Sequence, residues 1–289
     1  QVSVRIINNH TNIVWIKHNN EILFDNIDVK KTNLENSVYQ SLNMKDIYDF
    51  STKADISDLT EIISKQIEYN TAISKEGLSK NYGANIGSTI LKTYGNDVRN
   101  RCKAKTAAGS DARMNGSGLP VIINAGSGNQ GMTASLPVIE YAHEMGVTKD
   151  KLYRALVLSN LIAIYQKTHI GYLSAFCGAV SAGAAAGAAI TYLKNGDYED
   201  ISHTLINALA IASGIICDGA KASCAAKIAI SVDAGILASD MHDNGQDFYA
   251  GDGIVGVDVE NTIKNVGHLG RVGMKETDKE ILCLMTCFD

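Results

Sequence analysis

The pattern of hydrophobic and polar residues changes once along the chain. Near the N-terminus, apolar and polar positions alternate in three short runs, Val4–Ile7, Ile13–Ile16 and Glu21–Phe24, separated by Asn- and His-rich turns. Alternation with a period of two is typical of β-strands, and Asn favours tight turns. The sequence therefore predicts a small β-meander in residues 1–35.

After about residue 45, the apolar positions follow a helical spacing. Residues 55–74 repeat isoleucine and leucine at intervals of three and four, which places them on one face of a helix. Similar patterns recur at residues 79–95, 97–113, 131–146, 149–168, 172–194, 198–216, 221–243, 257–269 and 276–288. Only two prolines interrupt this part of the chain. A series of closely packed helices is expected.

The predicted fold class is mainly α with a small N-terminal β-containing piece, α+β overall. Residues 51–289 would form an Ala- and Gly-rich multi-helix domain, and residues 1–50 the β-containing remnant of a truncated N-terminal domain. Gln1 leads directly into a strand-like run, so we expect the chain to be a fragment that lacks an upstream segment.

Composition narrows the classes of function. Hydrophobic residues make up 45% of the 289 residues and charged residues 20%, which is typical of a globular protein. The net charge of −5 offers no basic face for nucleic acid. Six cysteines without a secretory signal favour reduced thiols in the cytoplasm over a disulfide framework.

One uncharged stretch, residues 171–193, is long enough to cross a bilayer. It is dominated by Ala, Gly and Ser, which gain little by entering lipid. We predict a tightly packed internal helix there and no membrane partner.

Three cysteines lie among small, uncharged residues. Cys217 and Cys224 are nearly two helical turns apart and would point the same way on one helix, while Cys177 comes from a separate segment. Three soft thiolates suit a zinc ion or an iron–sulfur cluster and leave one metal position for substrate. The alternative is three small apolar core side chains, because Cys-x6-Cys is not a standard metal-binding spacing.

A glycine-rich stretch precedes these cysteines. Gly126-x-Gly128-x-x-Gly131 matches the dinucleotide-binding fingerprint, but the residues that follow predict a second helix where a Rossmann unit needs a strand. NAD is therefore not predicted. Glycines at a helix N-terminus also favour a phosphate or a substrate carboxylate, and a plain glycine turn is the alternative.

Two further polar groups have alternative interpretations. Arg113 could bind a carboxylate through two hydrogen bonds, or simply lie in the last turn of a helix. His10 could carry a proton, or could be a turn residue. The remaining histidines show no ligand spacing: His18, His143, His169, His203, His242 and His268.

Five motifs together carry a resemblance that covers essentially the whole chain. They are His10-Thr-Asn-Ile, Ser74-Lys-Glu-Gly77-Leu-Ser, Ser110-Asp-Ala-Arg-Met, Gly126-Ser-Gly-Asn-Gln-Gly131 and Cys217-Asp-Gly-Ala-Lys-Ala-Ser-Cys224. With them, the chain resembles the iron–sulfur L-cysteine desulfidases, which are related to the iron–sulfur L-serine dehydratases.

The resemblance implies a [4Fe–4S] cluster held by Cys177, Cys217 and Cys224, with the fourth iron open. It implies the conversion of L-cysteine to pyruvate, ammonia and hydrogen sulfide. A homodimer would agree with it. The substrate contacts that it implies are Ser127, Gly128, Asn129 and Gln130, then Thr11, Asn12 and Arg113, with His10 as the catalytic candidate.

The chain departs from the family pattern at both ends. The family's upstream Leu-Gly-Cys-Thr-Glu-Pro type motif, whose cysteine would be a base or an extra ligand, is not in this chain. We therefore expect the general base to lie upstream. In serine dehydratases a terminal cysteine can cap the open iron. Here we favour Cys283 and Cys287 as residues on the apolar face of a final helix.

Three other functions remain as alternatives. The same site could dehydrate L-serine. The chain could also be a non-catalytic redox sensor that binds a cluster or an amino acid. A pyridoxal-phosphate lyase would need a Schiff-base lysine, and nothing around Lys221 demands that role.

Overall fold

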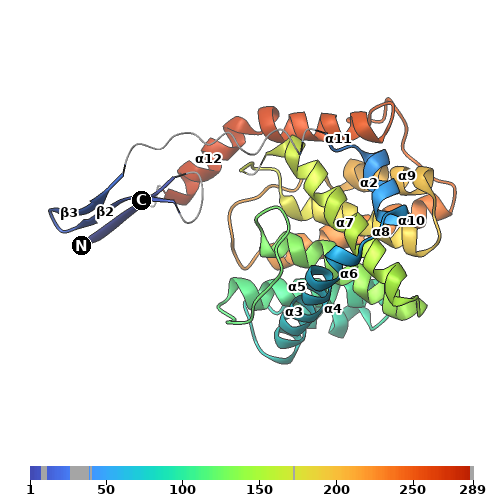
Figure 1. The fold of residues 1–289 in the computed structure, drawn as a ribbon, viewed down its shortest axis with the longest axis horizontal. Coiled ribbons are helices and arrows are strands. Elements are labelled where there is room, and N and C mark those ends of the chain that lie inside the picture. The colour runs from blue at the N-terminus through green and yellow to red at the C-terminus, as the bar shows by residue number, and fades with distance from the viewer. Residues whose placement is uncertain (8–11, 27–38, 40, 172, 287–289) are drawn as a thin grey trace. The chain divides into compact units, whose positions relative to one another are not determined.

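The computed structural model describes residues 1–7, 12–26, 39, 41–171 and 173–286. It divides into two compact units, Gln1–Ser41 and Leu42–Asp289. The first unit ends nine residues before the boundary at residue 50 that the change in residue pattern indicates. The predicted fold class is confirmed, because helices dominate and a small antiparallel sheet lies at the N-terminus (Figure 1).

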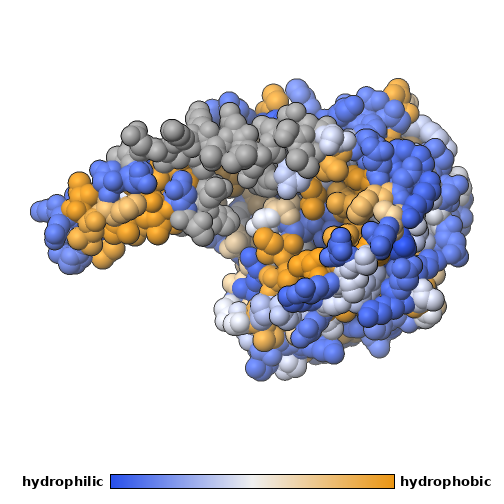
Figure 2. Space-filling model, in the orientation of Figure 1, coloured by the Kyte–Doolittle hydropathy of each residue, from blue (hydrophilic) through white to orange (hydrophobic). Residues whose placement is uncertain are grey.

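The N-terminal unit contains the three strands β1 (Val2–Ile6), β2 (Ile13–His18) and β3 (Glu21–Asp25) in sequential antiparallel order. Within this sheet Val14 is buried, whereas most of the large apolar side chains, such as Val4 and Ile22, stay exposed (Figure 2). A sheet of three short strands has too little area to bury both of its faces by itself.

The helical unit is built from the following elements. They are α2 (Met44–Lys53), the 3₁₀ turn η1 (Ser57–Leu59), α3 (Thr60–Ser79), α4 (Ile86–Tyr94), α5 (Val98–Met114), α6 (Gly128–Met145), α7 (Lys149–Ile170), α8 (Gly178–Leu193), α9 (Tyr198–Ala212), α10 (Cys224–Asp243), α11 (Val259–His268), the π-helical turn η2 (Leu269–Gly273) and α12 (Lys275–Thr286).

Helix α8 is the buried centre of this unit and packs against α6, α7, α9 and α10. A Cβ atom at Gly183 would lie 2.4 Å from the carbonyl oxygen of Ser231, and one at Gly187 would lie 2.4 Å from that of Gly235. The backbones of α8 and α10 therefore touch and run in the same direction. Their N-termini consequently lie at the same end of the unit.

The expectation of an internal helix in residues 171–193 agrees with the burial of α8. In the part of the chain that the structure describes, none of the helices combines the length and the apolar character that a membrane span requires.

Ion pairs to the buried Glu140 carboxylate hold α5 against α6. Glu140 accepts a hydrogen bond from Arg101 Nε at 2.5 Å and another from the Lys105 ammonium. Burial alone would raise the pKa of Glu140, but these two hydrogen bonds outweigh it and hold the pKa below the ordinary value. Helices α5 and α6 also carry Arg113 and the glycine-rich loop, so this contact helps to position both.

Replacing Glu140 with glutamine is expected to lower the free energy of unfolding by about 2 kcal/mol at pH 7, since it removes the charge from two charge-assisted hydrogen bonds. A lowered folded-state pKa contributes stability that is complete above the usual value of 4.5 and is lost as the pH falls through the folded-state pKa. The difference between wild type and Glu140→Gln should therefore disappear in acid. Urea unfolding between pH 3 and pH 7 measures it.

The matched control is Glu144→Gln, on the same helix. Glu144 also pairs with Arg101, but its side chain is 53% exposed, so we expect a loss of only about 0.5 kcal/mol. Equal losses for the two variants would contradict the special role of Glu140.

Candidate iron–sulfur site

Cys177 and Cys217 are brought together by backbone pairing. Phe176 and Ile216 form an isolated antiparallel bridge. On either side of it, the Cys177 N–H donates to Ile215 at 3.1 Å and the Cys217 N–H donates to Ala175 at 2.6 Å. The two thiols lie within hydrogen-bonding distance of each other. The segment before α8 and the segment before α10 therefore meet at these cysteines.

The expectation that Cys217 and Cys224 share one helix is wrong. Helix α9 ends at Ala212 and α10 begins at Cys224, so Cys217 lies in the irregular segment between them. Gly219 has a φ of +94°, a left-handed conformation that interrupts a right-handed helix. Cys224 still faces back into this segment, since its sulfur lies 3.5 Å from the carbonyl oxygen of Gly219.

Electrostatics favour a thiolate at Cys217. The hydrogen bond from the Cys177 thiol, helped by the Gly219 N–H and by the positive charges of Lys227 and Lys167, lowers the pKa of Cys217 against the cost of burial. The same hydrogen bond and burial raise the pKa of Cys177. Because the thiolate is the form of cysteine that binds metal, Cys217 is prepared to act as a metal ligand.

The glycine-rich loop begins helix α6. Asn124 and Ser127 exchange two backbone hydrogen bonds, of 2.9 and 3.1 Å, and close a tight turn. Within this turn, Gly126 adopts a φ of +80°. Ser127 is the N-cap residue of α6, and its hydroxyl accepts a hydrogen bond from the Gln130 N–H at 3.3 Å. The first turn of α6 is therefore fixed by the loop's own side chains.

Arg113, in the last turn of α5, lies over this first turn of α6. A Cβ atom at Gly128 would come within 2.4 Å of Arg113 Nε, so glycine is needed for this approach. The guanidinium also lies 3.4 Å from the side-chain oxygen of Asn129. Burial lowers the pKa of Arg113, and the negative charge of Cys224 opposes this shift. Arg113 thus lies within electrostatic reach of both the loop and Cys224.

Gln130 connects the glycine-rich loop to the cysteines. Its side chain lies against Gly178, the first residue of α8, where a Cβ atom would come within 2.5 Å of the Gln130 amide carbon. The Gln130 amide oxygen is buried and has no hydrogen-bond partner among the described residues. A buried acceptor without a donor costs free energy, so this oxygen is available to a ligand.

The N-termini of α6, α8 and α10 therefore converge at one place. Each helix N-terminus carries a partial positive charge and free N–H groups, which favour an anion. The predicted loop residues, Arg113 and the three cysteines, which come from distant parts of the sequence, meet there.

Sequence reasoning missed Lys167, in the last turn of α7. Lys167 is 5% exposed. Burial lowers the pKa of its ammonium group, and the nearby thiols of Cys217 and Cys177 oppose this shift only in part. A lysine in a sequence usually indicates a solvent-exposed position, so nothing in the local sequence predicts that Lys167 is buried.

The remaining predicted residues belong to other elements or lie outside the described residues. Asn12 directly precedes β2 in the N-terminal unit, where its side-chain amide donates to the carbonyl oxygen of Ile7 at 3.0 Å. Asp111, in the same motif as Arg113, accepts the Ile86 N–H at 2.7 Å and caps α4. Cys283 is exposed on α12. His10, Thr11 and Cys287 lie outside the described residues.

The donor set fits an iron–sulfur cluster better than a single metal ion. Sulfurs around one zinc ion lie about 3.8 Å apart, because each Zn–S bond is about 2.3 Å. In the described part of the chain, the three cysteine sulfurs do not all lie within 4.8 Å of one another. Soft thiolates, nearby positive charges and wider spacing suit a larger anionic group.

Comparisons with known proteins show the family of this chain. The sequence model of a family described as serine dehydratase alpha chain matches residues 21–283. The chain is 57% identical over 284 residues to a UPF0597 protein of Desulfitobacterium hafniense and 52% identical over 282 residues to one of Lachnoclostridium phytofermentans. The alignments cover 98% of this chain but only 66% and 67% of those proteins, so the chain spans about two thirds of their length.

Proposed function

The chain belongs to the serine dehydratase alpha chain family, and on this premise we propose that it forms the cluster-binding part of an iron–sulfur-dependent lyase. The proposed reaction is the α,β-elimination of L-cysteine, in which L-cysteine and water give pyruvate, ammonia and hydrogen sulfide. The proposed cofactor is a [4Fe–4S] cluster bound by Cys177, Cys217 and Cys224.

One observation carries this proposal. Three thiols, a half-buried guanidinium and an unpaired buried amide oxygen converge at the N-termini of three helices. Thiolates hold iron, while Arg113 and the N–H groups of α6 suit a carboxylate. An amino acid whose side chain is a metal ligand matches both parts of the site, the thiols that would hold iron and the groups that would bind a carboxylate.

Bound there, the cluster supplies a Lewis-acidic iron with one open coordination position. The protein's own residues bind and orient the substrate. Arg113 and the first turn of α6, with Ser127 and Asn129, would hold the carboxylate, and the Gln130 oxygen would accept a hydrogen bond from the ammonium. Such anchoring at both ends fixes the Cα–H bond relative to the proton acceptor.

We predict that the proton acceptor lies in the remaining third of the whole protein, and His10 is the catalytic candidate within this chain. Thr11 and Asn12 remain predicted substrate contacts. The homodimer and the cytoplasmic location are also predictions.

The substrate is the part of the proposal most in need of a test. A thiolate is a softer ligand for iron than a hydroxyl and leaves more readily, which favours L-cysteine. L-Serine is the second candidate, because the matching family is named for serine dehydration.

The full-length protein, reconstituted anaerobically, should be assayed with both amino acids side by side. We expect kcat/KM for L-cysteine to exceed that for L-serine by at least about tenfold. The reverse ratio would establish the second candidate. Failure of both reactions with an intact cluster would instead favour the redox sensor.

Lys167 should support this reaction by balancing negative charge. Replacing it with glutamine removes a buried positive charge beside Cys177 and Cys217, so we expect kcat to fall by about tenfold to a hundredfold. Lys149→Gln, an exposed position on the same helix, is the matched control and should leave kcat unchanged. Steady-state kinetics of the iron-loaded variants measure both, and an unchanged kcat for Lys167→Gln would show that its charge is not used.

A further inference from the structure

A second cluster of potential metal ligands lies towards the other end of α10. His203 is on α9, His242 is in the last turn of α10, and Asp247 follows α10 in the chain. At 1.5 Å per residue, His242 is about 27 Å along α10 from Cys224. This cluster is therefore separate from the iron–sulfur site.

The three side chains converge closely. His242 Nδ1 lies 3.0 and 3.1 Å from the two carboxylate oxygens of Asp247. His203 Nδ1 lies 3.8 Å from the nearer oxygen of the same carboxylate. One ligand atom from each residue fits within a span of 4.8 Å, and this is the one such group of three found in the described part of the chain.

The Nδ1 nitrogen of His203 has no evident structural role. This nitrogen is buried and has no hydrogen-bond partner within the described residues. The two imidazole rings are stacked, with centroids 5.4 Å apart and an interplanar angle of 4°. The His203 ring would have to turn about its Cβ–Cγ bond to direct the Nδ1 lone pair at an ion shared with His242 and Asp247. At His203 Nδ1 this motion breaks no hydrogen bond.

The surrounding contacts are those of a supported metal site. His242 Nε2 donates its proton to Asp200 Oδ1 at 2.9 Å, and Nδ1 donates to the Asp247 carboxylate, so a metal ion would take the place of the Nδ1 proton while Asp200 holds the other nitrogen. Asn207 donates to Asp247 Oδ1 at 2.9 Å and orients the carboxylate. Metal-ligating histidines commonly donate their other N–H to a carboxylate in this way.

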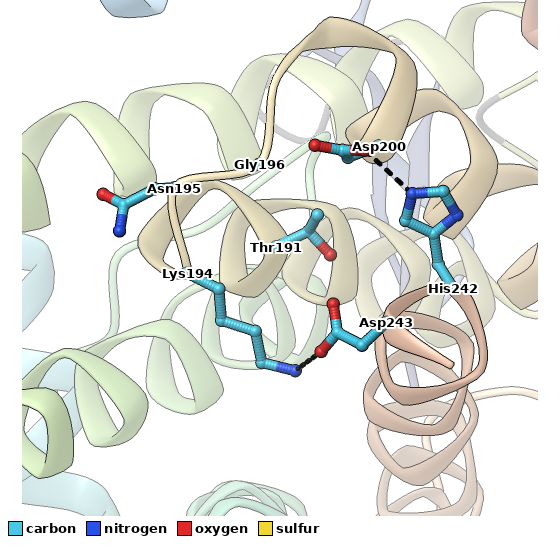
Figure 3. A pocket seen from close by; sticks show the side chains of 7 residues that line it. All are labelled: Thr191, Lys194, Asn195, Gly196, Asp200, His242 and Asp243. Carbon is cyan, nitrogen blue, oxygen red and sulfur yellow. Dashed lines mark hydrogen bonds and ion pairs between the residues drawn. The ribbon is translucent and has the colours of Figure 1, made fainter. Parts of the chain in front are cut away.

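A pocket of about 250 Å³ lies beside one member of this cluster, His242. Figure 3 shows Asp200 and His242 together on one side of the pocket, with Lys194 paired to Asp243 on another. An ion in water can therefore approach the outer edge of the His242 imidazole.

We propose that His203, His242 and Asp247 bind one divalent transition-metal ion of the Zn²⁺ type, with water in the fourth position. Two imidazole nitrogens and one carboxylate oxygen form a ligand set that such ions accept. The ion joins α9, α10 and the segment after α10, so its role is to hold that segment against the two helices.

The test uses Zn²⁺ alone and separates this site from the cysteines by bond length. X-ray absorption of the zinc-loaded protein should show Zn–N/O bonds of about 2.0–2.1 Å at the proposed site, in addition to Zn–S bonds of about 2.3 Å from any zinc held by cysteines. His203→Gln should lose one zinc per chain by metal analysis and lose the shorter shell. His143→Gln, an exposed histidine on α6, should lose neither.

Thermal unfolding distinguishes a loss of zinc binding from a folding defect in the His203→Gln variant. In a chelator, wild type and His203→Gln should unfold at similar temperatures. Zinc at about a hundredfold excess over its Kd should then raise the Tm of wild type by about 5 °C and leave that of His203→Gln unchanged. Only Zn–S bonds in wild type, or the same zinc content in wild type and His203→Gln, would overturn the proposal.

Discussion

Replacing Cys217 with serine is expected to lower the rate of hydrogen sulfide release from L-cysteine by at least about a thousandfold, which corresponds to about 4 kcal/mol in the activation free energy. Cys217 is the thiol whose environment most favours the thiolate, through the Cys177 hydrogen bond and nearby lysines. A serine hydroxyl remains protonated at neutral pH and is a hard ligand. It therefore cannot replace the thiolate on iron.

Cys102→Ala is the matched control for this prediction. Cys102 is fully buried between α5 and α6, where its thiol lies 3.6 Å from the carbonyl oxygen of Pro137. We expect this change to lower stability and to leave the activity of each iron-loaded molecule unchanged. If Cys217→Ser kept a tenth or more of the wild-type rate, Cys217 would not be a cluster ligand.

Replacing Arg113 with alanine is expected to raise the KM for L-cysteine by about a hundredfold with a smaller effect on kcat. The guanidinium lies over Gly128 and beside Asn129, where a substrate carboxylate would be held equally in the ground state and the transition state. Charge-assisted hydrogen bonds to such a group are worth about 1.5–3 kcal/mol each. Steady-state kinetics of the reconstituted full-length variant would measure the change.

Two variants make this prediction specific. Arg113→Lys keeps the charge but not the planar fork, so we expect a KM between those of wild type and Arg113→Ala. Arg99→Ala, at the other end of α5, breaks the 2.7 Å ion pair with Asp233 and should change stability without changing KM. A normal KM in Arg113→Ala would remove Arg113 from the substrate site.

Most of the fold follows from local pattern. Apolar spacing indicates the helices well, as with α5, expected at 97–113 and observed at Val98–Met114. The segment that holds Cys217 does not follow local pattern, because its geometry depends on the Phe176–Ile216 bridge between residues forty positions apart. Spacing within one segment carries no information about such a contact.

The residues of the two candidate sites also divide into those that local sequence indicates and those that only tertiary packing brings together. The cysteines, Arg113 and the glycine-rich loop could be predicted because short motifs surround them. Lys167 and the group of His203, His242 and Asp247 could not, since their neighbours in space come from other elements and their sequence spacing follows no metal-binding pattern. Only packing brings these groups together.

The central claim is that the three cysteines bind an iron–sulfur cluster. Its most direct test is the amount of iron and acid-labile sulfide per chain in the full-length protein after anaerobic reconstitution. We predict about four of each in wild type, as for a [4Fe–4S] cluster, and their loss in Cys217→Ser. Wild-type protein that binds no iron, or a Cys217→Ser variant that keeps its full iron and sulfide, would contradict it.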